Sequence, residues 1–202
     1  MKKALISVAL SALALGGLSG VQFAAAAGPG PAYLNVMSFT AEAENANRAE
    51  LSVTTRGDIP WHADAFITSK LGVGFAWVDP NSSTVFAMTI HPTLGVDSTQ
   101  NPQGWHAHVV TLQGGATAPN DLCIKSVDSA PRVGISMEDN TLEVRVHGSD
   151  LPWAPGRVKA AAGFIIQADT GCASGLAVEL ITSSTSADRS EDPGGEQSDL
   201  GR

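Results

Sequence analysis

Short runs of β-branched and aromatic residues recur along most of this chain, about every ten residues. Clusters of Asp, Asn, Pro and Gly separate many of the runs, and these residue types favour turns. Short strands at this spacing are typical of an antiparallel sandwich or barrel. The runs that predict strands are 33–40, 50–55, 74–78, 84–91, 106–113, 122–127, 132–137, 141–147, 158–167 and 176–182.

One run shows how a strand would lie in the fold. Leu142 and Val144 alternate with polar residues, so a strand over 141–147 would bury one face and expose the other. A helix is indicated only over 41–49, where Ala and Glu are frequent but two asparagines interrupt the segment. We therefore predict an all-β fold, an antiparallel β-sandwich of the immunoglobulin-like or Greek-key kind, over residues 28–182.

Two segments of the chain resemble each other. Residues 51–61 and 142–153 each contain an alternating strand, a turn with Gly and Asp, and a Pro-Trp pair, and the second copy has the extra residue Ser149. The two tryptophans, Trp61 and Trp153, either cover the ends of a shared core or form a paired ligand platform. We favour the structural interpretation, because Pro and Asp have ordinary roles in stiffening and capping turns.

Residues 1–27 have the three parts of a secretory signal peptide. Lys2 and Lys3 provide a positive start, residues 4–15 are mostly apolar, and a run of alanines ending at Ala27 supplies a cleavage site. The apolar run is shorter than the roughly 20 residues that cross a bilayer. We expect cleavage near Ala27 and a mature protein that is secreted or periplasmic.

Residues 183–202 are rich in Ser, Asp, Glu and Gly and have almost no apolar side chains. Such a segment cannot bury enough surface to offset the entropy of ordering it, so we expect a disordered acidic tail. The whole chain carries a formal net charge of −8 and has no cluster of Lys and Arg. Nucleic acids and anionic membranes both need such a cluster. We therefore expect neither partner, and no membrane span.

Cys123 and Cys172 are the only cysteines of the chain. An isolated pair in an exported protein is most often a disulfide. In the chain-entropy model, closing a loop of this length stabilises the fold by about 4 kcal/mol. A catalytic thiol would need a Cys-x-x-Cys motif or cationic neighbours, and the sequence shows neither. We predict one disulfide, Cys123–Cys172.

The sharpest signal for chemistry is the pair His106 and His108 in the predicted strand 106–113. Residues two apart in a strand point to the same face, so both imidazoles could bind one Cu²⁺ or Zn²⁺ ion. Without a metal, the two rings would bond to backbone or water on the face of a sheet. A stable metal site needs a third or fourth ligand. The remaining histidines are His62, His91 and His147.

Residues 104–108, Gly-Trp-His-Ala-His, resemble the copper-binding strand of the copper/zinc superoxide dismutases, which has Gly-aromatic-His-x-His. Residues 144–147, Val-Arg-Val-His, are similar to the strand with that family's last copper histidine. The resemblance implies His106, His108 and His147 as copper ligands, and Cys123–Cys172 as the counterpart of the intrasubunit disulfide. The chain departs from the family between His108 and His147, where it has no metal-bridging histidine and no zinc-binding loop.

Three functions remain open. We favour a non-enzymatic binding or structural module, whose ligand would be a small molecule, a glycan or a protein. The second is a copper-binding, superoxide-dismutase-like protein. The third is a carbohydrate-binding module that stacks sugars on its tryptophans. The chain has no Gly-x-Ser-x-Gly elbow, phosphate-binding loop or His-Glu-x-x-His motif, so no sequence signature favours an enzyme.

Overall fold

The computed structural model describes residues 30–62, 71–91, 104–118 and 121–181. The predicted signal peptide and acidic tail lie outside these residues. The described part consists of β-strands and short 3-10 helices, which confirms the all-β class. The first sheet contains, in spatial order, β1 (Val36–Asn45), β2 (Arg48–Thr55), β8 (Thr141–His147) and β7 (Val133–Glu138). The second contains β10 (Leu176–Ile181), β6 (Asp121–Ser129), β5 (His106–Gln113), β4 (Thr84–Ile90), β3 (Gly72–Val78) and β9 (Ala160–Ala168). The 3-10 helices are η1 (Ala32–Leu34), η3 (Gly148–Asp150) and η4 (Pro155–Arg157).

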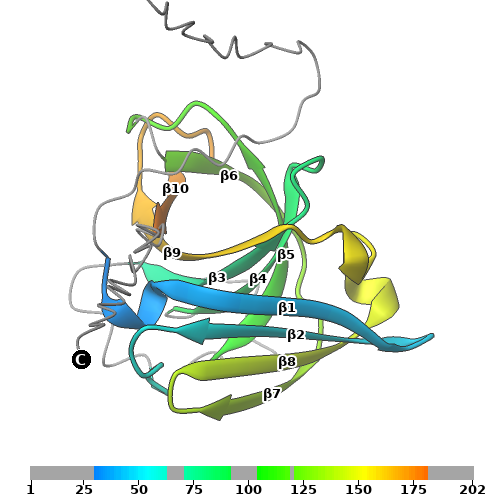
Figure 1. Ribbon diagram of the computed structural model, residues 1–202. Helices are drawn as coiled ribbons and strands as arrows, with labels where there is room; N and C mark the ends of the chain where they lie inside the picture. The colour runs from blue at the N-terminus through cyan, green and yellow to red at the C-terminus, as the bar shows by residue number, and fades with distance from the viewer. Residues whose placement is uncertain (1–29, 63–70, 92–103, 119–120, 182–202) are drawn as a thin grey trace, which may run out of the picture.

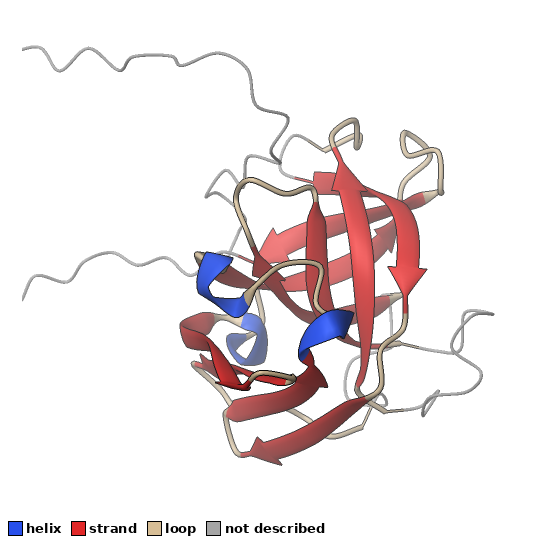
Figure 2. Cartoon of the chain, turned by 90° about the vertical axis from the view of Figure 1, so that its right-hand side faces the viewer, coloured by secondary structure: helices blue, strands red, loops and turns tan. Residues whose placement is uncertain are grey.

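The second sheet closes into a six-stranded barrel, and the four-stranded sheet lies against its side (Figures 1 and 2). The predicted simple sandwich is therefore corrected to a barrel with an attached sheet. Closure occurs because β10 pairs with β9 on one side and with β6 on the other, which leaves the barrel without an open edge. The helix predicted over 41–49 is also wrong. These residues form the β1–β2 hairpin, in which Ala43 pairs with Ala49.

Two separate apolar cores hold the structure together. The larger core lies between the four-stranded sheet and the outer face of the barrel, and its largest fully buried side chains are Phe75, Trp77 and Phe86. The second core contains inward-facing residues from all six barrel strands. Because β3 and β4 contribute to both cores, almost every residue in these two strands is buried. Strands buried on both faces read as continuous apolar runs, as these do.

The two similar segments of the sequence lie side by side as β2 and β8, the central strands of the four-stranded sheet (Figure 1). Their pairing is reciprocal, because Leu51 pairs with Val144 and Val53 pairs with Leu142. These residues occupy equivalent places in the two segments, so an approximate two-fold axis passes between the strands. All four side chains are fully buried.

The same symmetry continues into the barrel. Strand order β1-β2-β8-β7 in the sheet is matched by β4-β3-β9-β10 in the barrel, each centred on a pair of equivalent strands. In the barrel, Gly74 pairs with Phe164 and Phe75 pairs with Gly163, again reciprocally. The chain is thus two four-stranded units, β1–β4 and β7–β10. The β5–β6 hairpin lies between β4 and β10 and completes the barrel.

Candidate metal centre

Strand β5 presents His106 and His108 to the inside of the barrel, on the same face as Val110 and Leu112. This confirms that the two rings share one face. Strand β4 lies beside β5, with Thr89 opposite His106 and Ala87 opposite His108. The methyl group of Ala87 and the small side chain of Thr89 leave room for both rings. His91 follows the last residue of β4, two positions after Thr89, and so falls on the same face.

The three rings converge on one point. Nε2 of His106 is 3.0 Å from Nε2 of His91, and Nε2 of His91 is 3.4 Å from Nε2 of His108. Each histidine can place one ring nitrogen within 4.8 Å of the others. Metal–nitrogen bonds of about 2.0–2.1 Å at tetrahedral angles place ligand nitrogens about 3.3 Å apart. The separations of 3.0 and 3.4 Å from His91 to the other two rings are therefore close to those of ligands around one small cation.

The orientation of His106 selects the tautomer that a metal requires. Its Nδ1 is 2.8 Å from the carbonyl oxygen of Gly104. A carbonyl oxygen can only accept, so Nδ1–H donates, and in the neutral ring Nε2 has a lone pair directed at the cluster. Metal-binding histidines commonly donate their second N–H in this way, which fixes both the ring and its basicity. The hydroxyl oxygen of Thr89 is 3.4 Å from the same Nε2.

The cluster is shielded from water. His91, His106 and His108 are each no more than 5% exposed. Behind β5, on its opposite face, Trp105 stacks on Phe75 with ring centroids 5.5 Å apart. The ring nitrogens of the cluster therefore lie away from bulk solvent.

The barrel interior beside the cluster contains an apolar cavity of about 190 Å³. His91 and His108 form part of its wall, and so does Thr89. The remaining wall is made of aliphatic residues and Phe164. A cation held by the three rings would therefore lie beside a largely apolar space.

The other histidines considered as ligands lie elsewhere. His147 is exposed at the end of β8, in the other sheet, with Nδ1 2.8 Å from the hydroxyl oxygen of Ser149. The group of three that the structure assembles contains His91 in place of His147. His62 is exposed. The only sequence signal for His91 as the third ligand was its position. It ends the predicted strand 84–91, which comes directly before the predicted strand with His106 and His108.

The structure does not present Trp61 and Trp153 as a pair. Trp153 is 5% exposed and its indole N–H donates to the carbonyl oxygen of Thr84 at 3.2 Å. Trp61 is 54% exposed. Trp153 therefore covers the core, as the structural interpretation predicts. Of the two tryptophans, only Trp61 is exposed enough to contact a ligand.

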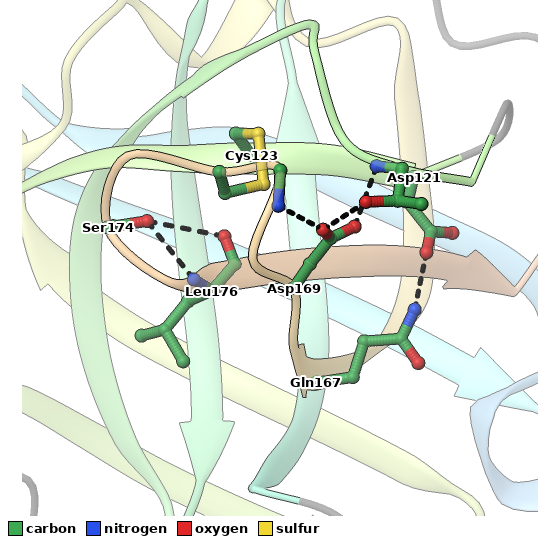
Figure 3. Close-up of a disulfide and its surroundings, with 9 residues drawn as sticks. Asp121, Cys123, Gln167, Asp169, Ser174 and Leu176 are labelled. Atoms are coloured by element: carbon green, nitrogen blue, oxygen red, sulfur yellow. Dashed lines mark hydrogen bonds between the residues drawn. A yellow bond between two sulfur atoms is a disulfide. The ribbon is translucent and has the colours of Figure 1, made fainter.

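Cys123 and Cys172 form the predicted disulfide, with their Cα atoms 5.3 Å apart. The bond joins β6 to the turn between β9 and β10, beside Ala177 (Figure 3). In the same turn Asp169 accepts hydrogen bonds from the backbone N–H groups of Thr117 and Gly171, each at 2.7 Å. The disulfide and this carboxylate therefore hold one end of the barrel.

Asp121 and Asp169 lie near this disulfide (Figure 3). Their pKa values are shifted in opposite directions. Hydrogen bonds, first of all from the Thr117 hydroxyl, lower the pKa of Asp169. Burial raises the pKa of Asp121, although a hydrogen bond from the Gln167 amide acts in the opposite direction. Both shifts follow from hydrogen bonding and desolvation, the ordinary causes in a folded protein.

Comparisons with protein-family models, with curated proteins and with solved structures found no match for this chain. The resemblance to the copper/zinc superoxide dismutases thus rests on short segments alone. Among the residues that the structure describes, no helix has the length and apolar character needed to cross a membrane.

Proposed function

We propose that this protein binds one transition-metal ion, zinc or copper, through Nε2 of His91, His106 and His108. The observation that carries the proposal is the convergence of three buried imidazole nitrogens at separations of 3.0 and 3.4 Å. Buried polar side chains are usually satisfied by backbone or by complementary donors and acceptors. In this cluster the ring nitrogens lie within hydrogen-bonding distance of one another, and an ion that displaced the N–H proton between them would find a lone pair on each ring. Imidazole suits zinc and copper better than it suits magnesium or calcium.

Three protein ligands leave at least one coordination position open, as in catalytic rather than structural zinc sites. When bound, the ion would act as a Lewis acid or, for copper, as a redox centre. The chain itself contributes rigidity, because two ligands lie in a central barrel strand and the third follows the neighbouring strand. It also contributes an apolar cavity beside His91 and His108. These properties suit a protein that binds a small ligand through its metal, and we propose binding rather than turnover as the function.

We further propose that the protein works outside the cytoplasm. The Cys123–Cys172 disulfide supports this location, because disulfides persist in oxidising compartments and are rare in the cytosol. Residues 1–27 would be removed on export. The metal site would then be filled from the extracytoplasmic supply of zinc or copper.

Metal analysis of untagged protein tests the proposal. The protein would be stripped with chelator, loaded separately with Zn²⁺ and Cu²⁺, and analysed by mass spectrometry of the metal and by titration calorimetry. We expect one ion per chain, and an at least 100-fold loss of affinity in His91→Ala and His108→Ala. His147→Ala and His62→Ala are the matched controls, because both remove an exposed imidazole and should leave affinity unchanged.

Electron paramagnetic resonance of the copper-loaded protein identifies the ligands directly. We expect hyperfine coupling from imidazole nitrogens in the wild type, and its reduction in the His91→Ala variant. Equal binding by wild type and all single-histidine variants of the cluster would contradict the proposal. So would a larger loss in His147→Ala than in His91→Ala.

A further inference from the structure

The barrel interior is incompletely filled. Protein cores are normally packed as densely as organic crystals, with few voids larger than a water molecule. Here the cavity inside the barrel measures about 190 Å³. An engineered apolar cavity of about 150 Å³ stays dry and binds benzene. The space in this barrel is therefore large enough for a molecule of roughly six to ten non-hydrogen atoms.

The wall of the cavity is apolar except near one end. Side chains from all six barrel strands line it, among them Val85, Val110 and Leu180. Its polar members are Thr89, His91 and His108, which lie together. Val85 is three inward-facing positions before His91, which corresponds to about 20 Å along the strand. The cavity thus has an apolar body and one polar, imidazole-lined end.

The polar end of the cavity is also the proposed metal site. His91 and His108 both contribute to the cavity wall and to the group of converging nitrogens. Because His91 and His108 also line the cavity, a molecule in the cavity would lie next to an ion held by the cluster. The best ligand for such a space joins an apolar body to one metal-binding atom.

We propose that the barrel cavity binds a small, mainly apolar molecule that coordinates the metal through one nitrogen, oxygen or sulfur donor. The apolar body would fill the space beside Val85 and Leu180, and the donor would reach the ion between His91 and His108. The inference rests on the proposed metal binding. Recognition would combine burial of apolar surface with one directional bond, as is usual for small-molecule sites.

A pair of probes of equal size separates the contribution of apolar burial from that of the bond to the metal. Toluene and 4-methylpyridine have the same shape, but only 4-methylpyridine has a donor atom. Titration calorimetry on the zinc-loaded protein should show 4-methylpyridine binding at least 10-fold more tightly than toluene. On the metal-free protein the two probes should bind with similar affinity, which should be weaker than that of 4-methylpyridine for the zinc-loaded protein.

Filling the cavity provides the matched variants. Val85→Phe should weaken both probes at least 10-fold and leave the zinc content at one per chain, because Val85 is far from the histidines. Ala76→Leu, which fills the same cavity with a smaller side chain, is the second variant in case Val85→Phe folds poorly. Val133→Phe is the control. It adds the same volume in β7 of the other sheet and should leave the affinity for both probes unchanged.

The outcomes distinguish this inference from the metal proposal. Zinc binding at full stoichiometry without binding of either probe overturns the cavity ligand and leaves the metal site in place. Toluene binding with no zinc binding overturns both the metal site and the donor-bearing ligand. Probe binding that is unaffected by Val85→Phe and Ala76→Leu also overturns the inference, because the probes then bind elsewhere.

Discussion

Trp61 and Trp153 occupy equivalent positions in the two similar segments, yet one is exposed and the other is buried. Trp153 is 5% exposed and donates to the carbonyl oxygen of Thr84, whereas Trp61 is 54% exposed. In the first segment the residue before the tryptophan, Pro60, accepts a hydrogen bond from the indole N–H of Trp105 at 3.0 Å. The approximate two-fold symmetry therefore holds for the strands and breaks at the tryptophans.

This difference predicts unequal costs of truncation. Trp153→Ala should lower the free energy of unfolding by about 3–5 kcal/mol, because it leaves a cavity in the larger core and removes a hydrogen bond. Trp61→Ala should change it by less than about 0.5 kcal/mol. Urea unfolding followed by circular dichroism measures both. Equal losses in the two variants would show that the exposed tryptophan packs against something that stabilises it.

The reciprocal glycines of β3 and β9 predict a second pair of effects. A Cβ on Gly74 would meet the carbonyl oxygen of Met88 and the Phe164 ring, and one on Gly163 would meet the backbone of Leu34. Gly74→Ala and Gly163→Ala should therefore each destabilise the protein by about 1–3 kcal/mol or more.

Gly134→Ala is the control for both glycine variants. Its added Cβ would find its nearest neighbour at 3.7 Å, an ordinary van der Waals contact in β7. Thermal unfolding of the three variants should rank Gly134→Ala closest to wild type. A wild-type melting temperature for Gly74→Ala or Gly163→Ala would contradict the close strand approach.

The lowered pKa of Asp169 predicts a pH-dependent contribution to stability. The native pKa lies below the ordinary value of 3.8, so the native state binds fewer protons than the unfolded state in that range. The contribution is fully present above pH 3.8 and is lost as pH falls through the native pKa. Asp169→Asn should be less stable than wild type at pH 7, and the difference should shrink in acid. Denaturant titrations from pH 7 to pH 2 measure the difference in unfolding free energy between the two proteins. A difference that stays constant over this range would contradict the lowered pKa of Asp169.

Metal should stabilise the native protein through linkage. An ion that binds the native state raises the free energy of unfolding by about 2.7 kcal/mol at a free concentration of 100 times its Kd. Zinc should therefore raise the melting temperature of wild type and of His147→Ala, and chelator should reverse the rise. His108→Ala should show no rise. An equal rise in His108→Ala would place the bound zinc elsewhere.

The sequence predicted the strands because their patterns are local. Alternation along 141–147 reappears as a strand with one buried face, and runs 84–91 and 106–113 become β4 and β5. The shared face of His106 and His108 was predictable for the same reason, since side chains alternate with period two. The cysteine pairing followed from counting, because only one intramolecular pair is available.

The amino-acid pattern alone therefore determined the all-β class, most strand positions, the disulfide and the two-histidine signal, but not the β1–β2 hairpin over 41–49. Only the tertiary structure decided the closure of the barrel, the choice of His91 over His147, and the opposite environments of Trp61 and Trp153. Barrel closure depends on β3–β9 and β6–β10 pairing between segments far apart in the chain. Backbone hydrogen bonds are the same for every residue type, so they do not record in the sequence which distant strands pair. The pairing of β4 with β5 brings the third histidine to the other two, and the long-range pairing encloses the cavity beside them.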